Sequence, residues 1–163
     1  MRKEFGKIIV ELAEKDEKII VLTGDIGFGV LENFRNLFPD RFFNVGIREQ
    51  SMIGIAAGMA LEGLKPYAYA ITPFLIERAF EQIKIDIDQQ NVNVKLIGFA
   101  DYPLQGPTHA ELDGPKLMSL LKNTSNYFPK DSEETRRFLI ESYNSNKPAF
   151  ISLKKDKTNC NKL

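Results

Sequence analysis

Cysteine and histidine are almost absent from this sequence of 163 residues, which contains one of each, Cys160 and His109. A single cysteine cannot form a disulfide within the chain, and such usage is typical of proteins in a reducing compartment. One cysteine and one histidine also cannot build a zinc site of the usual nitrogen and sulfur kind. We therefore expect no metal centre made by this chain alone, and a cytoplasmic location.

Long apolar runs and an excess of charge of one sign are also missing. No apolar stretch approaches the roughly 18 residues that a membrane span requires. Residues 1–12 include Glu4 and Glu11 and lack the apolar segment of a signal peptide. The 22 basic residues balance 22 acidic ones, so charge gives no case for nucleic acid or an anionic membrane as the main partner. A net charge of zero does little to oppose association, so the composition is compatible with an oligomer.

What the chain does contain is the composition of a soluble globular protein. Hydrophobic residues make up 43% of it and charged residues 27%, which argues against disorder. Single domains commonly contain ~100–200 residues. We expect one domain over residues 1–155, followed by a polar tail over 156–163.

Strand and helix patterns alternate along the chain. Short β-branched or aromatic runs that end at glycine or proline predict strands, and apolar residues at helical spacing predict helices. This alternation is typical of an α/β fold, a mostly parallel sheet of about six strands with helices on both faces. The expected helices span 3–15, 30–37, 48–62, 73–87, 115–121 and 132–143, the last with Ser132 as N-cap, and the expected strands span 18–23, 41–45, 65–71, 92–100, 126–128 and 149–153.

The predicted helix over 48–62 has almost no polar face, so we expect it to be buried. Gly54 and Gly58 lie four residues apart, where two missing side chains let another backbone approach closely. Glycine inside a helix costs about 1 kcal/mol relative to alanine, and tight packing would offset that cost. The pattern fits an interface between chains as well as an internal core.

Ligands of open α/β sheets bind beyond the carboxyl ends of the strands. Four segments are therefore candidates for a site: 24–29, 46–50, 71–78 and 101–109. The first, within TGDIGFG, fits neither G-x-G-x-x-G nor the P-loop pattern, so its spacing alone indicates a glycine turn. The absence of a phosphate-loop signature argues against an unrelated nucleotide-binding module.

Three side chains in the other segments each allow two interpretations. Glu49 lies in the first turn of an apolar helix. In the first interpretation its charge is favoured by the helix dipole or by an ion pair with Arg48 or another base. In the second it shares a proton with a ligand. Phe74 is either a core aromatic or the flat wall of a ring-binding pocket. His109 is either a solvated loop residue or a group for proton transfer or a substrate hydrogen bond.

Taken in order, four segments resemble one family: VLTGDIGFG, FFNVGIREQSMIGIAAGMALEG, ITPFLIERAFEQIKID and GPTHAELD. They are similar to the pyrimidine-binding domain of transketolase-like, thiamine-diphosphate-dependent enzymes, which include transketolases and deoxyxylulose-phosphate synthases. The resemblance runs from about Lys18 to the end of the 132–143 helix. The pairing of NVGIREQ with GPTH about sixty residues later is specific, although neither motif is so alone.

The resemblance implies a role for each of four residues. Glu49 matches the glutamate that hydrogen-bonds N1′ of the cofactor's aminopyrimidine, and His109 matches a histidine that faces the substrate and the thiazolium; both would be catalytic. Phe74 matches an aromatic that stacks on the pyrimidine. Asp25 matches an acid near the thiazolium in transketolases, so Asp25, Glu49 and Phe74 would bind the cofactor.

Two further residues stay open. Arg78 is either a contact for a substrate phosphate or, as the favoured alternative, the partner of Glu77 or Glu81 in an ion pair on a helix surface. Gln105 stands where transketolases often have an acid that contacts sugar hydroxyls, so the resemblance does not identify the substrate.

The family's diphosphate-binding domain carries Gly-Asp-Gly and a later Asn that hold Mg²⁺, and Gly24-Asp25-Ile26 is not that motif. The family's C-terminal domain is also missing from this sequence. The resemblance therefore implies a separate subunit that carries the diphosphate-binding domain and most of the Mg²⁺ site, with an active site between chains and self-association of this one.

Two functions are compatible with the resemblance. In the first, the chain is a subunit of a split transketolase-like enzyme that transfers two-carbon ketol units between substrates of the sugar-phosphate type. In the alternative, it is a non-catalytic pyrimidine-domain partner that assembles or regulates another thiamine-diphosphate enzyme. The presence of both Glu49 and His109 favours the first.

Overall fold

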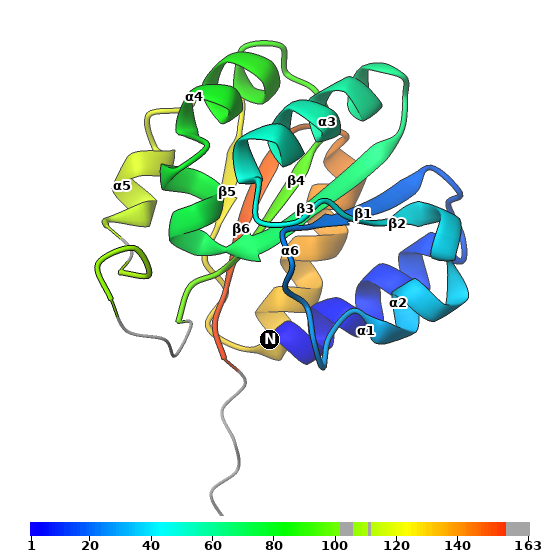
Figure 1. Cartoon of the computed structure of the whole chain (residues 1–163). Helices are drawn as coiled ribbons and strands as arrows, with labels where there is room; N and C mark the ends of the chain where they lie inside the picture. The colour runs from blue at the N-terminus through cyan, green and yellow to red at the C-terminus, as the bar shows by residue number, and fades with distance from the viewer. Residues whose placement is uncertain (102–105, 111, 156–163) are drawn as a thin grey trace, which may run out of the picture.

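Six strands form one parallel sheet in the order β2-β1-β3-β4-β6-β5 (Figure 1). The computed structural model describes residues 1–101, 106–110 and 112–155, so the expected tail over 156–163 and Gln105 lie outside the described residues. The predicted α/β class, with its parallel sheet of six strands, is confirmed. The strands are β1 (Ile19–Thr23), β2 (Phe42–Asn44), β3 (Lys65–Ile71), β4 (Lys95–Phe99), β5 (Ser125–Tyr127) and β6 (Ala149–Leu153).

The helices connect the strands. The predicted helix over 73–87 divides into two wide π-helical segments around one short α-helical turn, and Ala79 (φ −110°, ψ 22°) interrupts it. Within the described ranges, no helix is both long enough and apolar enough to cross a bilayer. The helices are α1 (Arg2–Ala13), α2 (Glu32–Leu37), the 3₁₀ turn η1 (Pro39–Arg41), α3 (Glu49–Leu61), the π-helix η2 (Pro73–Glu77), α4 (Phe80–Gln82), the π-helix η3 (Ile83–Asp88), α5 (Gly114–Met118) and α6 (Ser132–Ser145).

The two faces of the sheet pack into two separate cores. Helices α1, α2 and α6 cover one face, whereas α3, α4 and α5 cover the other (Figure 1). Alternate residues of β1 enter opposite cores: Ile20 and Leu22 pack on the α3 side, and Ile19 and Val21 on the α1 side. All five residues of β1 are buried, which explains why the central strands read as continuous apolar runs.

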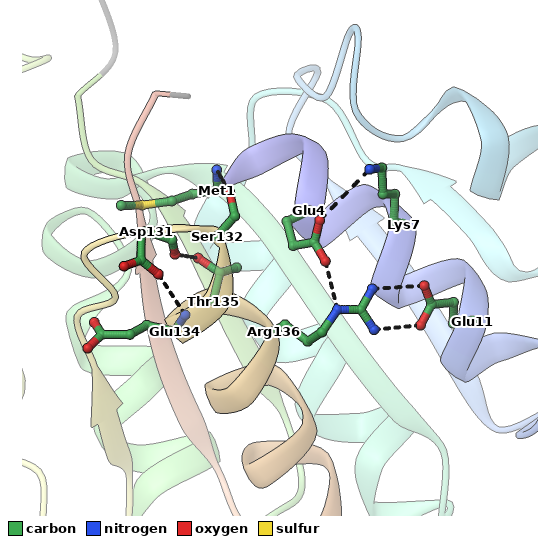
Figure 2. Close-up of polar contacts among 9 residues, drawn as sticks. All are labelled: Met1, Glu4, Lys7, Glu11, Asp131, Ser132, Glu134, Thr135 and Arg136. Carbon is green, nitrogen blue, oxygen red and sulfur yellow. Dashed lines mark hydrogen bonds and ion pairs between the residues drawn. The ribbon is translucent and has the colours of Figure 1, made fainter. Parts of the chain in front are cut away.

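Polar side chains connect α1 to α6, the neighbouring helices on one face of the sheet (Figure 2). Arg136 of α6 donates through Nε to Glu4 at 2.8 Å and through both terminal nitrogens to Glu11 at 2.9 Å. The N-cap of α6 is Asp131, not Ser132 as predicted, because the Asp131 carboxylate accepts from the backbone N–H of Glu134 at 2.8 Å. The Ser132 hydroxyl instead accepts from the amino group of Met1 at 3.1 Å.

Helix α3 is buried on one side only, so the prediction of a fully buried helix is wrong. Met52 and Ile53 have no exposed surface and contact the core. On the opposite side, no heavy atom lies within 4 Å of where a Cβ on Gly54 or Gly58 would stand, among the atoms that the structure places, and Leu61 is 61% exposed. The described part of the chain therefore leaves an apolar, glycine-lined face of α3 uncovered.

Lys95 has an ionisable side chain and is buried at the amino end of β4. This end of the strand lies at the edge of the sheet opposite the candidate loops. Its side chain is 1% exposed, and Nζ donates to the backbone carbonyl of Lys147. Burial, reinforced by the charge of Lys65, lowers the pKa of Lys95 to about 7. Its neighbour in the sheet, Tyr67, has a buried hydroxyl that makes no hydrogen bond within the described residues, and burial raises the pKa of Tyr67.

We predict that Lys95 makes the stability of the fold depend on pH above neutrality. Between pH 7 and about 10.4, the ordinary lysine pKa, the unfolded state holds a proton that the folded state has lost, so the free energy of unfolding rises with pH. The slope approaches about 1.4 kcal/mol per pH unit. Lys95→Met removes this rise, and urea denaturation of both proteins from about pH 7 to 9.5 checks it. Parallel pH profiles for the two proteins would contradict the assignment.

Candidate functional site

The candidate loops meet at one edge of the sheet, and the positions of three of them follow from the order of β2, β1 and β3. Strands β2, β1 and β3 are neighbours and run in parallel, so their carboxyl ends lie side by side. The segment 24–29 follows β1, the segment 46–50 leads from β2 into α3, and η2 follows β3. The topology thus places Asp25, Glu49 and Phe74 at the same edge, as the sequence predicts.

Glu49 is the first residue of α3, and it is almost completely buried, with 2% of its surface exposed. Its carboxylate accepts a hydrogen bond from Nη1 of Arg78 at 2.7 Å. Gly24, directly after β1, faces this carboxylate: a Cβ at this position would lie 3.4 Å from Oε1 of Glu49. The absence of a side chain on Gly24 therefore leaves space beside the acid.

The base that pairs with Glu49 is Arg78. Arg78 pairs with Glu49, so the favoured expectation of an ion pair with Glu77 or Glu81 is wrong, and Arg48 is not the base beside Glu49. Glu77 instead accepts from the backbone N–H of Leu112 at 2.7 Å, which anchors the segment after the GPTH motif. This hydrogen bond holds the Glu77 carboxylate against the loop that contains Leu112.

The π-helical geometry of η2 brings Arg78 over Phe74. The backbone N–H of Arg78 donates to the carbonyl of Pro73, five residues earlier, at 3.2 Å. Phe74 and Arg78 are four residues apart, and the guanidinium carbon lies 4.0 Å from the centroid of the ring. π-Helical turns occur often at functional sites. The i, i+4 spacing of an aromatic and an arginine was the signal in the sequence for this contact.

His109 completes the group. Its ring meets the Phe74 ring edge-to-face, with centroids 4.8 Å apart and planes at 64°. Nδ1 of His109 lies 3.2 Å from the Thr108 hydroxyl. The structure therefore brings Glu49, Arg78, Phe74 and His109 into one continuous set of contacts, called the Glu49 cluster below.

Asp25 lies at the same edge, and its hydrogen bonds connect it to Asn44 and not to the Glu49 cluster. Its backbone is left-handed (φ 57°), and Asn44 at the end of β2 exchanges two hydrogen bonds with it, one from the Asp25 N–H at 3.0 Å and one to its carboxylate at 3.1 Å. Oδ1 of Asn44 also accepts from the N–H of Gly46 at 3.0 Å. Asn44 thus ties the β1 loop to the turn that leads to Glu49. Sequence reasoning missed it, since nothing marks an Asn at a strand end as such a link.

Two cavities flank this edge, and neither is lined by Glu49, Phe74 or His109. One, of about 360 Å³, lies beside Asp25 and Asn44 and includes Arg35. The other, of about 920 Å³, lies at the ends of β4 and β6 and includes Leu112, Lys130 and Lys155. In the part of the chain that the structure describes, no three His, Cys, Asp or Glu side chains are grouped to hold a metal ion.

The fold and the loops match a known family. The family model described as transketolase, pyrimidine binding domain, matches residues 1–160. The chain belongs to this family. Thiamine diphosphate is the cofactor that membership implies for the enzymes related to this chain, so the buried glutamate at the start of α3 becomes the residue to test.

Two related enzymes of the family are longer than this chain. The 1-deoxy-D-xylulose-5-phosphate synthase of Aquifex aeolicus (strain VF5) is 40% identical over 153 residues, which cover 88% of this chain and 23% of that enzyme. One subunit of the apulose-4-phosphate transketolase of Actinobacillus succinogenes is 40% identical over 119 residues, which cover 71% of this chain and 38% of that subunit. The chain therefore spans about a quarter to two fifths of the length of these relatives.

Solved structures give the same fold. A split gene transketolase, described as an inactive beta4 tetramer, superposes with a TM-score of 0.86 at 33% identity, over 95% of this chain and 51% of the other. The transketolase of Campylobacter jejuni superposes with a TM-score of 0.84 over 94% of this chain and 25% of the other, at 21% identity, which shows the fold alone.

We predict that Glu49 and Arg78 are energetically coupled. Removing one partner of a fully buried pair costs ~3–5 kcal/mol, and solvent at the Arg78 side chain, 38% exposed, lowers that figure. Glu49→Gln and Arg78→Met should show a coupling of about 1–2 kcal/mol in a double-mutant cycle by urea denaturation. The pair of Glu134 and Arg137, 3.8 Å apart on the surface of α6, is the control and should be additive. Equal coupling for both pairs would refute the prediction.

Proposed function

We propose that this chain supplies the pyrimidine-binding half of a thiamine-diphosphate-dependent active site. A second subunit supplies the diphosphate-binding half, and together they transfer two-carbon ketol units between sugar-type substrates. The observation that carries this proposal is the Glu49 cluster: a carboxylate 2% exposed, connected through Arg78 to an aromatic ring and a histidine, at the carboxyl edge of the sheet.

The residues of the cluster fit the aminopyrimidine of the cofactor. Glu49 offers a buried acceptor to a ring nitrogen, Phe74 offers a ring face for stacking, and Gly24 leaves space beside the carboxylate. When bound, thiamine diphosphate supplies a carbon nucleophile and an electron sink for two-carbon transfer. Glu49 holds and shares the proton at N1′, which is general acid–base work for a carboxyl group shielded from water.

The other predicted residues take supporting roles in the proposal. The edge-to-face contact with Phe74 holds the His109 imidazole next to the ring face, where it can hydrogen-bond or transfer a proton to the substrate. Asp25 would lie near the thiazolium, and its two hydrogen bonds with Asn44 fix the orientation of its carboxylate. Mg²⁺ is held mainly by the partner subunit.

The larger cavity, at the ends of β4 and β6, contains both lysines and aspartates. Lys130, Lys154 and Lys155 line it, and their ammonium groups have no ion-pair partner among the described residues. The acids of the cavity are engaged by backbone amides: Asp101 accepts from Lys155, Asp113 from Lys116 and Asp131 from Glu134. The three lysine and three aspartate side chains of the cavity balance in charge, so the support for a sugar-phosphate substrate comes from a relative. The relative named for apulose 4-phosphate acts on a phosphorylated sugar by its name.

Association with a second chain is supported by the uncovered face of α3. Gly54, Gly58 and Leu61 leave this face flat and apolar in the described structure. α3 begins at Glu49, so a chain docked on this face would stand close to the acid. This placement, together with the relative whose name marks it as one subunit of a transketolase, supports the proposal of a homodimer or of two copies with two partner subunits.

The non-catalytic alternative rests on one observation, the ion pair of Glu49 with Arg78. An acid that stays paired with an arginine is unsuited to sharing a proton with a ligand. Under this alternative the chain would associate with the diphosphate-domain subunit, and the mixture would have no activity.

We predict that Glu49→Gln slows proton loss from C2 of thiamine diphosphate in the mixture of this chain, the diphosphate-domain subunit, cofactor and Mg²⁺. Glutamine accepts a hydrogen bond but cannot share a proton, so the rate of C2 hydrogen exchange with deuterated water, followed by NMR, should fall by about 10²-fold or more. Glu62→Gln, at the exposed end of α3, is the control. Exchange at the wild-type rate in Glu49→Gln refutes the role. A wild-type mixture that associates but is inert favours the non-catalytic alternative.

We predict that His109→Asn lowers turnover without weakening cofactor binding. His109 joins the cluster through its contact with the Phe74 ring, whereas Arg78 is the side chain that meets Glu49, so the pyrimidine contacts remain. The expected loss in kcat/KM for ketol transfer is about 10²- to 10⁴-fold, and the cofactor Kd should stay within about threefold. Thr108→Ala, which removes only the hydroxyl near Nδ1, should have a smaller effect. A parallel loss of cofactor affinity and turnover would place His109 in cofactor binding instead.

A further inference from the structure

The Arg78 guanidinium makes both contacts that the proposed function assigns to the aminopyrimidine. It donates to the Glu49 carboxylate at 2.7 Å, and its carbon lies 4.0 Å from the centre of the Phe74 ring. A guanidinium is a flat cation with N–H donors along its edge, and it stacks on aromatic faces. A protonated aminopyrimidine is likewise flat, with N–H groups along one edge. The side chain therefore has the shape and the donors of the ring that these two residues would receive.

Arg78 and a cofactor ring cannot contact Glu49 and this face of Phe74 at the same time. A ring stacked on the face of Phe74 that Arg78 covers would occupy the volume of the guanidinium, since the two would lie at the same stacking distance. Among the described residues, Arg78 is also the hydrogen-bond partner of the Glu49 carboxylate. A ring that takes Glu49 and this face of Phe74 must move Arg78 away.

The structure provides both a reason for Arg78 to lie there and a route out. A buried carboxylate without a partner is costly, so in the absence of a ring the arginine stabilises Glu49. Yet 38% of the Arg78 side chain is exposed, and its backbone is fixed by the π-helical hydrogen bond to Pro73. The guanidinium can therefore turn into solvent by side-chain rotation alone, with η2 unchanged.

We propose that Arg78 is an internal competitor for the pyrimidine position, which the cofactor ring must displace from Glu49 and Phe74. This inference rests on the proposed function and adds a regulatory contact to it. While Arg78 is in place, Glu49 stays ion-paired and the position is closed. The chain therefore releases the acid only when a ring with enough binding energy, anchored through the partner subunit, takes its place.

The test measures ring binding directly and does not use activity. The probe is 4-amino-5-hydroxymethyl-2-methylpyrimidine, which lacks the diphosphate, and its Kd for the full chain is measured by NMR titration. The same series is measured with thiamine diphosphate and Mg²⁺ on the chain mixed with the diphosphate-domain subunit. Arg78→Met should bind both ligands about tenfold or more tightly than wild type, a difference of about 1.4 kcal/mol.

Two further variants make the result specific. Arg78→Lys keeps the charge but loses the planar fork, so its affinity should lie between those of wild type and Arg78→Met, and it serves if Arg78→Met does not fold. Arg137→Met is the matched control, because Arg137 lies 4.7 Å over Phe138 and 3.8 Å from Glu134 on α6, away from the cluster. It should bind as wild type does.

A second readout follows Arg78 itself. In the wild-type chain, the Arg78 side-chain N–H signals should exchange slowly with water, and saturation with the probe should make them exchange quickly. Unchanged signals on saturation, or an affinity of Arg78→Met or Arg78→Lys equal to or below that of wild type, would overturn the inference. In the Arg78→Met background, where the competitor is gone, Glu49→Gln should lose affinity. If it binds as tightly as Arg78→Met alone, the proposed function fails; if it loses affinity while the Arg78 variants gain none over wild type, the inference alone fails.

Discussion

A buried negative charge at the ligand-binding edge of the sheet is the constraint on which the rest of the site depends. Burying a carboxylate is unfavourable unless a cation or donors reach it. Glu49 meets that need with one arginine, which comes from another element and is itself partly exposed. In the described structure the acid is therefore paired with a partly exposed arginine, and the proposed displacement by the cofactor ring depends on this contact.

The sheet topology explains why this acid has an aromatic ring and a histidine as neighbours. Adjacent parallel strands β2, β1 and β3 end at one edge, so segments that are distant in the sequence meet there. Two apolar cores hold the sheet from both faces and leave the edge as the place where polar side chains gather. Asn44 and Glu77 then fix the loops to each other by hydrogen bonds.

The chain spans only part of the length of the relatives it matches. It spans about a quarter of the length of the synthase it resembles. In the described residues, one face of α3 is uncovered, and that helix begins at the proposed cofactor acid. A second chain docked on this face, as proposed, would lie near Glu49, and the proposed role of Arg78 is to close the pyrimidine position until the ring binds.

The sequence by itself determined the fold class, the six strands and the loops that meet at one edge of the sheet, because periodicity and glycine positions are local properties. The sequence motifs around Glu49 and His109 indicated the family. The tertiary structure alone decided that Arg78 pairs with Glu49, since 29 residues separate them and local spacing favoured Glu77 or Glu81. It also decided that α3 is buried on one side only, because composition does not say which apolar face the rest of the chain covers.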